Sequence, residues 1–229
     1  MADEAPQFRH ERKFAIRGLT ASEVTATVRH HPALFFPEFA PRTINNIYFD
    51  TPDLRNYHQN VEGDRVRAKL RVRWYGALFG ALPKAVLEQK KKLGLLGTKR
   101  TAVLRPFEFR PGTAAHAVRD WLAASPLPED LRRESQMTAP TLVNRYRRSY
   151  YRSADRRIRL TVDSELTFCR YQRTSGTLLV RVTLPEVVVV ELKYAAAASD
   201  LAVEVSNRLP FRMTRMSKYV VGVDAVGLG

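Results

Sequence analysis

The sequence contains a single cysteine, Cys169, and this scarcity excludes a framework of disulfide bonds. Its five histidines lack the spacing of metal ligands, and no cluster of cysteine and histidine suggests a zinc site. No uninterrupted apolar run approaches the length of a membrane-spanning helix, and the opening stretch MADEAPQFRHERKF lacks the apolar core of a signal peptide. Together these absences predict a cytoplasmic protein.

Acidic residues are few relative to basic ones. The chain has 38 Lys and Arg residues against 23 Asp and Glu residues, which gives a formal net charge of +15 at pH 7. Such an excess implies a polyanionic partner: nucleic acid, an anionic membrane or a small phosphorylated ligand. Internal repeats, low-complexity tracts and long linkers are also absent, and 229 residues are enough for one domain with a substantial core.

The stretch DRVRAKLRVRW, residues 64–74, shows how the positive charge is arranged. A cation occupies every second position from Arg65 to Arg73, and apolar residues from Val66 to Trp74 occupy the positions between them. A period of two predicts a β-strand with one cationic and one apolar face, because successive side chains of a strand point to opposite sides. Neighbouring cations on that face would lie about 7 Å apart, a spacing at which successive phosphates could be gripped.

The same alternation recurs along the chain and predicts eight or nine strands. The other segments are residues 8–16, 44–50, 85–92, 98–104, 144–151, 157–168, 177–184 and 186–194. A glycine-rich turn at 94–97 is expected to join two of them. Helices are expected between strands, and the first, at 19–31, opens with a capping box of Thr20 and Glu23. Further helices are expected at 113–125, 128–136, 198–210 and 214–223.

The charged strands can be explained separately or together. A solvated outer face is the simplest explanation of any one of them. Taken together, several strands with cationic faces and apolar opposite faces favour a closed, mainly antiparallel eight-stranded β-barrel, with helices outside and charge inside. A lumen crowded with cations is repulsive unless it holds an anion. The predicted fold is therefore α+β, with a tunnel that holds a polyanion.

Nine short motifs occur in the chain in a fixed order. They are ERKF (11–14), NNIYFDT (45–51), KLRVRWYG (69–76), LEQKKK (87–92), TKR (98–100), RYRRSYY (145–151), RIRLTVDSELTF (157–168), VVELKY (189–194) and MSKYVVG (216–222). In this order they resemble the catalytic domain of the vacuolar transporter chaperone (VTC) polyphosphate polymerases, which belong to the triphosphate tunnel metalloenzymes. The resemblance implies a single tunnel domain over residues 1–229, with a helical insertion near 112–136.

The resemblance also implies roles for individual side chains. The catalytic phosphate contacts would be Arg71, Arg73, Lys90, Arg159, Lys193 and Lys218. Further contacts to substrate would come from Lys13, Tyr48, Lys69, Lys99, Arg148 and Ser217. In the crowded RYRR segment the family's Tyr-x-Arg pattern selects Arg148 over Arg147. Mn²⁺ or Mg²⁺ would be held by Glu191 and Glu88.

Several acidic residues keep two interpretations. Glu88 is either a metal ligand or the partner of Lys90, and Glu191 is either a metal ligand or paired with an arginine. Asp163 and Glu165 are candidates for a second metal or for a base that positions water, and both also suit salt bridges. One departure from related branches is informative: Arg9 stands where the thiamine-triphosphatase and adenylate-cyclase branch has a carboxylate, which fits the polyphosphate side of the superfamily.

Two classes of function follow. The first is a metal-dependent polyphosphate polymerase that transfers the terminal phosphate of ATP, or another nucleoside triphosphate, to polyphosphate. The same fold could instead hydrolyse triphosphate or short chains. The second is a non-catalytic polyphosphate-binding protein, but carboxylates among the cations favour metal chemistry. Specific nucleic-acid binding is not expected, because the richest cationic face carries no aromatic residue for stacking on bases. Trp74 and Trp121 are expected to pack in the core, and a membrane partner stays open.

Overall fold

The computed structural model describes residues 9–93 and 96–229. Residues 1–8 and half of the turn expected at 94–97 lie outside the described residues. The chain divides into two compact units. The first contains the described residues up to Arg42, with Tyr146–Leu166 and Thr183–Met216, and the second contains Thr43–Arg145, Thr167–Val182 and Ser217–Gly229. The single domain over 1–229 stays a prediction.

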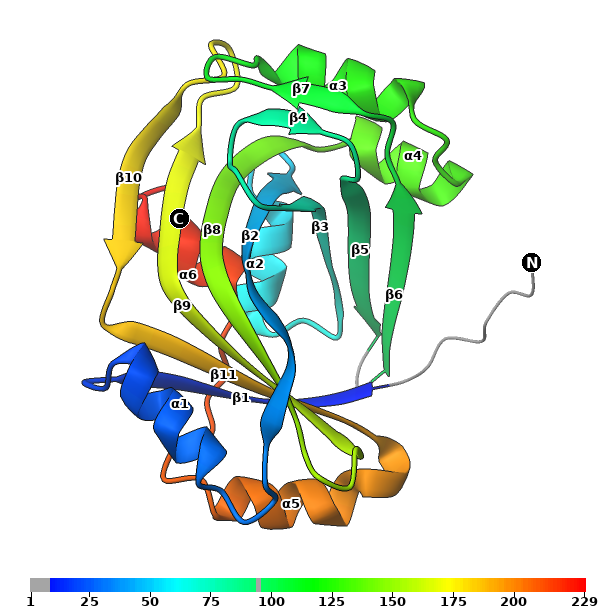
Figure 1. Cartoon of the computed structure of the whole chain (residues 1–229). Helices are drawn as coiled ribbons and strands as arrows, with labels where there is room; N and C mark the ends of the chain where they lie inside the picture. Colours follow the sequence, from blue (N-terminus) through cyan, green and yellow to red (C-terminus); the bar gives the residue numbers. More distant parts are fainter. Residues whose placement is uncertain (1–8, 94–95) are drawn as a thin grey trace. The chain divides into compact units, whose positions relative to one another are not determined.

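The described residues form strands and helices in the order shown in Figure 1. The strands are β1 (Arg9–Arg17), β2 (Phe36–Asp50), β3 (Val66–Tyr75), β4 (Gly80–Leu82), β5 (Val86–Leu93), β6 (Leu96–Val103), β7 (Phe107–Phe109), β8 (Ala139–Arg152), β9 (Ile158–Tyr171), β10 (Leu178–Leu184) and β11 (Val187–Ala195). The helices are α1 (Ala21–Arg29), α2 (Arg55–Glu62), α3 (Ala115–Ala124), α4 (Glu129–Gln136), the short 3₁₀ helix η1 (Ala196–Ala198), α5 (Ser199–Asn207) and α6 (Lys218–Ala225). The fold class is α+β, as predicted.

The strands pair in one large antiparallel sheet. Its hydrogen-bonded path runs β1-β11-β9-β8-β2-β3-β5-β6, with β10 paired to β9, and β4 and β7 form a separate two-stranded sheet. The eight strands of the path match the predicted number, and β10 adds a ninth. Within the described part of the chain, the path has β1 and β6 at its ends. Closure of this sheet into a barrel therefore stays a prediction.

The core of the first unit forms between strands and two helices. Phe14 of β1 and Val190 of β11 are buried with Val24 of α1 and Val205 of α5, and Figure 1 shows α1 beside β1. The capping box predicted at the start of α1 is confirmed: the Thr20 hydroxyl accepts from the backbone N–H of Glu23 at 3.2 Å, and the Glu23 carboxylate accepts from the Thr20 N–H at 2.7 Å.

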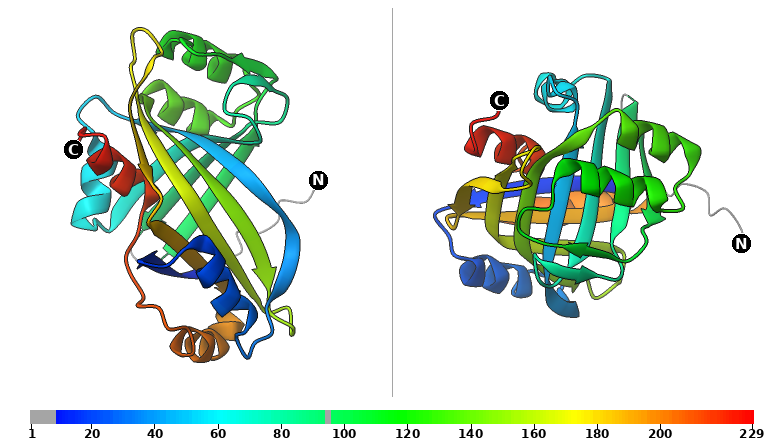
Figure 2. Two further views of the ribbon diagram at one scale, coloured as in Figure 1. Left: turned by 60° about the vertical axis from the view of Figure 1, so that its left-hand side comes forward. Right: turned by 90° about the horizontal axis from the view of Figure 1, so that it is seen from above.

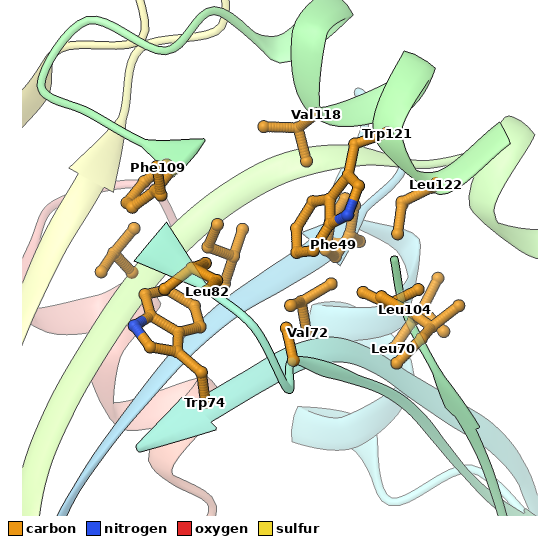
Figure 3. Packing of buried hydrophobic residues seen from close by; sticks show 14 of the residues in the cluster. Phe49, Leu70, Val72, Trp74, Leu82, Leu104, Phe109, Val118, Trp121 and Leu122 are labelled. Atoms are coloured by element: carbon orange, nitrogen blue, oxygen red, sulfur yellow. The ribbon is translucent and has the colours of Figure 1, made fainter. Parts of the chain in front are cut away.

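The core of the second unit contains both tryptophans. Trp74 of β3 packs edge-on against Phe109, with ring centroids 5.6 Å apart, and Trp121 of α3 lies in the same cluster (Figure 3). Each indole N–H is satisfied, because Trp74 donates to the carbonyl of Ala77 at 2.9 Å and Trp121 to that of Arg105 at 2.8 Å. The prediction that both tryptophans pack in the core is confirmed, and so are the helices expected at 113–125 and 128–136, which are α3 and α4.

The alternation of β3 holds over most of the strand. Leu70 and Val72 are completely buried in the core, while Arg71 and Arg73 lie on the opposite face and are partly exposed. The pattern fails at the start, because β3 begins at Val66 and this side chain is 62% exposed. The predicted apolar face is therefore shorter than the sequence suggests.

The sequence did not reveal α2, because its cap comes from a different segment. Its N-cap residue, Leu54, has a left-handed backbone and makes no side-chain cap hydrogen bond. Instead the fully buried carboxylate of Asp50, at the end of β2, accepts from the backbone N–H groups of Asn56 at 2.9 Å and Tyr57 at 3.0 Å. Asp50 also accepts from the hydroxyl of Tyr219 on α6, and Figure 2 shows α2 and α6 side by side.

None of the helices in residues 9–93 and 96–229 combines the length and the hydrophobicity that a transmembrane span requires.

Candidate functional site

Glu88 of β5 lies among three cations in the second unit. Its Oε2 atom accepts from Nη2 of Arg71 at 2.7 Å and from Nε of the same side chain at 2.9 Å. Its Oε1 atom is 2.8 Å both from Nη2 of Arg73 and from Nζ of Lys99. The register places Glu88 directly opposite Arg71, with Arg73 and Lys99 diagonal to it on the two neighbouring strands. We call these four residues the Glu88 cluster.

The Glu88 cluster keeps an excess of positive charge. Glu88 is only 3% exposed, and burial by itself would raise the pKa of its carboxyl group. Arg71, Arg73 and Lys99 outweigh burial and lower this pKa to about 2, so the carboxylate is ionised at neutral pH. One negative charge faces three positive charges, which leaves the cluster suited to bind a further anion.

Further predicted residues surround the Glu88 cluster in the same unit. Arg71 donates from Nη1 to the hydroxyl of Tyr48 at 3.2 Å. Lys69 donates to the hydroxyl of Ser217 at 2.8 Å, and Ser217 is the N-cap residue of α6. Lys90 lies opposite both Lys69 and Lys99 in the strand register. Cross-strand pairing therefore collects cations from β3, β5 and β6 on one face of the sheet.

Lys218 differs from the exposed lysines of the surface. It is the first residue of α6, and only 6% of it is exposed. Its position directly after Ser217 keeps it in the second unit, in the segment that contacts Lys69.

Glu191 of β11 occupies a comparable position in the first unit. Its Oε2 atom is 2.9 Å from Nζ of Lys193 and 3.0 Å from Nη2 of Arg148, and its Oε1 atom is 3.6 Å from Nζ of Lys13. A second carboxylate, Glu11 of β1, is 3.5 Å from the ammonium groups of both Lys13 and Lys193. Two carboxylates thus share two lysines.

Arg148 links Glu191 to a third carboxylate. It donates from Nε and Nη2 to the two oxygens of Asp163, at 2.5 and 2.6 Å. Burial would lower the pKa of the Arg148 guanidinium, but the charges of Asp163 and Glu191 raise this pKa well above its ordinary value. Arg145 and Arg147 are exposed, so Arg148 is the buried arginine of the segment. The salt-bridge interpretation of Asp163 is the one that this geometry supports.

We call this second group the Glu191 cluster. Its members are Glu11, Lys13, Arg148, Asp163, Glu191 and Lys193. Three carboxylates balance three cations here, in contrast to the positive excess around Glu88. A divalent cation would be repelled less by this cluster than by the Glu88 cluster.

A metal would find two neighbouring carboxylates at Glu191 and Glu11. Mg²⁺ is commonly held by one or two carboxylates together with substrate phosphates and water. In the part of the chain that the structure describes, no group of three or more Asp, Glu, His or Cys residues is arranged to hold a metal. The donor set therefore fits a metal whose remaining ligands come from phosphate and water. Glu88 fits less well, because the Glu88 cluster has three cations and no second carboxylate.

Two predicted residues lie at the edge of the first unit's site. Arg159 is opposite Lys193 in the register, 46% of its side chain is exposed, and its Nη2 is 3.7 Å from Oε1 of Glu38. Glu165 is exposed and has a positive φ of 56° within β9, so it leaves the regular strand geometry. The ion pairs of Glu191 found in the described residues are made by Lys13, Arg148 and Lys193, and do not include Arg159.

The structure brings the predicted residues together in two groups, one in each unit, while their functional roles stay predictions. The sequence did not single out Glu11, although Glu11 and Lys13 lie two positions apart and so share one face of β1. It also did not single out Asn46 and Asn144, which make a buried contact in the second unit. No short-range signal could reveal that contact, since 98 positions separate the two residues.

Comparisons with known proteins place this geometry in a family. In a comparison with curated proteins no sequence matches. A candidate adenylate cyclase from Vibrio parahaemolyticus has a similar structure: identity is 12%, 94% of this chain and 98% of that chain are covered, and the TM-score is 0.52. The PH1819 protein from Pyrococcus horikoshii is 12% identical over 94% of this chain and 99% of that one, with a TM-score of 0.49. At 12% identity the first likeness shows a shared fold alone. A family model described as the VTC domain matches residues 8–226. The chain therefore belongs to the VTC-domain family, as its motifs predicted.

Proposed function

We propose that the protein is a metal-dependent polyphosphate polymerase, which transfers the terminal phosphate of ATP to a growing polyphosphate chain. The observation that carries this proposal is the Glu88 cluster, where Arg71, Arg73 and Lys99 converge on one carboxylate and retain a positive excess. An arginine presents a planar fork that suits the oxygens of a phosphate as well as those of a carboxylate. A phosphate can therefore replace Glu88 as the partner of these cations.

Phosphoryl transfer depends mainly on holding the reacting groups in line and on neutralising their charge. In this proposal Arg71 and Arg73 orient one phosphate, and Lys99 adds a point charge. The other predicted contacts hold neighbouring phosphates: Lys13, Tyr48, Lys69, Lys90, Arg148, Arg159, Lys193, Ser217 and Lys218. Their convergence on one closed eight-stranded tunnel is part of the proposal.

The metal, Mn²⁺ or Mg²⁺, is proposed to bind at Glu191 and Glu11. When bound, such a metal neutralises charge on phosphate oxygens. Lys13 and Lys193, which contact both carboxylates, would then be released to pair with phosphate instead. Arg148 stays fixed by Asp163 and keeps Glu191 in place. We place Glu88 outside the metal site and propose that it orients the arginines.

A second candidate is a polyphosphate-binding protein without catalysis. It is favoured by one observation, that the carboxylates of both clusters are all ion-paired with lysine or arginine. Carboxylates whose only task is to orient cations would show the same pairing. The two candidates differ in whether Glu191 is needed for turnover.

Incubation with ATP and Mn²⁺ or Mg²⁺, followed by separate assays for polyphosphate chains and free phosphate, tests the proposal. A polymerase yields chains that require the metal. Free phosphate from ATP, triphosphate or polyphosphate without chains would instead indicate a hydrolase of the same fold. If the protein binds polyphosphate but forms neither polyphosphate chains nor free phosphate, the second candidate, a non-catalytic polyphosphate-binding protein, is supported. The cytoplasmic location expected from the sequence belongs to this proposal.

A further inference from the structure

Two asparagines form a buried amide pair in the second unit. Asn46 of β2 donates from Nδ2 to Oδ1 of Asn144 on β8 at 2.7 Å, and neither residue is exposed to solvent. The other two amide atoms, Oδ1 of Asn46 and Nδ2 of Asn144, are buried and have no hydrogen-bond partner among the described residues. Buried polar atoms are nearly always partnered, so this pair calls for a ligand or an ordered water.

The pair offers one donor and one acceptor whichever way the amides are turned. An N–H of one amide must meet the oxygen of the other at their contact. If both amides are inverted, the contact is kept and the two outer atoms exchange their roles. A ligand that satisfies the pair must therefore both accept and donate a hydrogen bond.

A third unpartnered atom belongs to the neighbouring strand. Arg73 of β3 lies directly opposite Asn46 in the register, so the two side chains share one face. The Nε atom of Arg73 is buried and also has no hydrogen-bond partner within the described residues, while its Nη2 contacts Glu88. Arg73 is 20% exposed, so it is the member of the group that a ligand would reach first.

We propose that Asn46, Asn144 and Arg73 form a subsite for a phosphate group that still carries a proton. This inference deepens the proposed function and rests on it. The P–OH group would donate to the outer amide oxygen of the pair, and the charged oxygens would accept from the outer amide nitrogen and from Nε of Arg73. Glu88 contacts Nη2 of Arg73 and not Nε, so a phosphate can bind at Nε while this ion pair remains.

This chemistry distinguishes the end of a phosphate chain from its interior. A terminal phosphate loses its last proton with a pKa of about 6, so it carries P–OH groups in mildly acidic solution. Interior phosphates have already lost their only proton and can only accept. An interior phosphate in this subsite would leave the amide acceptor unsatisfied, which weakens binding by roughly tenfold or more. The subsite thus selects chain ends, or free phosphate, over interior units.

Inorganic phosphate and sulfate test the inference, because they share a shape but sulfate carries no proton at pH 6. Titration calorimetry at pH 6 without added metal would measure both affinities. Charge alone favours sulfate, since its charge is larger, whereas the subsite favours phosphate. We expect wild type to bind phosphate more tightly than sulfate. In the double variant Asn46→Leu/Asn144→Leu, the ratio of phosphate affinity to sulfate affinity should fall by about tenfold or more.

A matched control is Asn45→Leu. Asn45 lies opposite Trp74, on the core side of β2, and its amide donates to the carbonyls of Gly76 and Ala77. This variant should be less stable yet keep the preference for phosphate. The side-chain amide NMR signals of Asn46 and Asn144 in wild type give a second measurement that requires no variant. They should shift on addition of phosphate and stay in place with sulfate.

A second comparison separates chain ends from free phosphate. Linear tripolyphosphate has two end groups, whereas cyclic trimetaphosphate has none. If chain ends occupy the subsite, the double variant should weaken tripolyphosphate binding by about tenfold and leave trimetaphosphate unchanged. If only inorganic phosphate responds, the subsite takes free phosphate.

The inference and the proposed function fail in different ways. The subsite is overturned if the wild type binds tripolyphosphate but does not prefer phosphate over sulfate. It is also overturned if the double variant keeps this preference. In both cases the proposed function stands. The subsite is likewise overturned if the amide signals of Asn46 and Asn144 do not change on addition of phosphate, because the pair is then satisfied by an ordered water only. A wild type that binds none of these anions overturns both.

Discussion

Arg71 directs both Nε and Nη2 at one oxygen of Glu88, at 2.9 and 2.7 Å. Because Arg71 uses only Oε2, the other oxygen is left for Arg73 and Lys99. One buried carboxylate therefore fixes the positions of three cations that would otherwise repel one another. The arginine forks are held in place before any phosphate arrives, which lowers the cost of ordering them on binding.

The ionisation of Glu88 should make stability depend on acid pH. The folded pKa of about 2 lies below the ordinary value of 4.5, so the stabilisation is present above pH 4.5 and is lost as pH falls toward 2. A shift of this size corresponds to about 3 kcal/mol. Urea unfolding of wild type and Glu88→Gln between pH 6 and pH 2 measures it. The difference between the two proteins should shrink across this window, and a constant difference would contradict the assignment.

Arg71→Ala should weaken polyphosphate binding and turnover together. In the structure the Arg71 side chain contacts Glu88 and Tyr48. Its guanidinium group is proposed to hold phosphate throughout the reaction. Loss of a charged hydrogen-bonding group typically costs 1.5–3 kcal/mol, or roughly a 10- to 100-fold weaker affinity. Arg110→Ala is a suitable control, because that side chain is 75% exposed and pairs only at 3.5 Å with Glu108. Equal effects of the two variants would indicate nonspecific binding by surface charge.

Glu191→Gln separates catalysis from binding. The substitution keeps the size of the side chain and removes the charge proposed to hold the metal. We expect turnover to fall by roughly 100-fold or more, while polyphosphate binding survives or tightens because the substitution leaves the charge-balanced Glu191 cluster with a positive excess. Asp163 still neutralises Arg148, so the fold should persist.

Glu186→Gln serves as its control, since Glu186 is exposed and pairs with Arg17 at the surface. Rates measured with ATP and Mn²⁺ give the loss of turnover, and melting temperatures show whether the fold persists. A Glu191→Gln variant with full turnover would remove the metal from this position.

Asp50→Asn should loosen both α2 and α6. The Asp50 carboxylate accepts from two N–H groups of α2 and from the Tyr219 hydroxyl, so a neutral amide loses charged hydrogen bonds in a buried place. Burial, followed by the nearby charge of Asp50, raises the pKa of Tyr219, which therefore stays a donor at neutral pH. We expect a loss of about 1–3 kcal/mol in the free energy of unfolding.

Tyr57→Phe provides the comparison for Asp50→Asn. It removes the surface hydrogen bond between Tyr57 and Asp224. The free energy of unfolding should therefore fall much less than in Asp50→Asn. Urea unfolding gives the stabilities, and hydrogen exchange of the α2 amides locates the change. Unchanged exchange in α2 after Asp50→Asn would refute the role of this carboxylate.

Local patterns in the sequence were enough to predict most elements. Alternation between cations and apolar residues in β3 determined which face of the strand enters the core, because a strand has only two faces. Thr20 and Glu23 marked the start of α1, since both halves of a capping box lie within four residues. The order of the motifs predicted the family. By contrast α2 stayed hidden, because its cap, Asp50, belongs to the preceding strand.

The sequence by itself determined that the protein carries cationic strand faces and belongs to the VTC-domain family. Only the tertiary structure decided which charges meet. Glu88 and Glu191 look alike in sequence, each two positions before a lysine. Strand pairing gives Glu88 three cations and no second carboxylate in its cluster, whereas it gives Glu191 the company of Glu11 and Asp163. Asn46 and Asn144 likewise became a pair only through strands far apart in the chain. The physical reason is that electrostatic and hydrogen-bonding partners act over a few ångströms in space, and register between distant strands, not spacing along the chain, sets those distances.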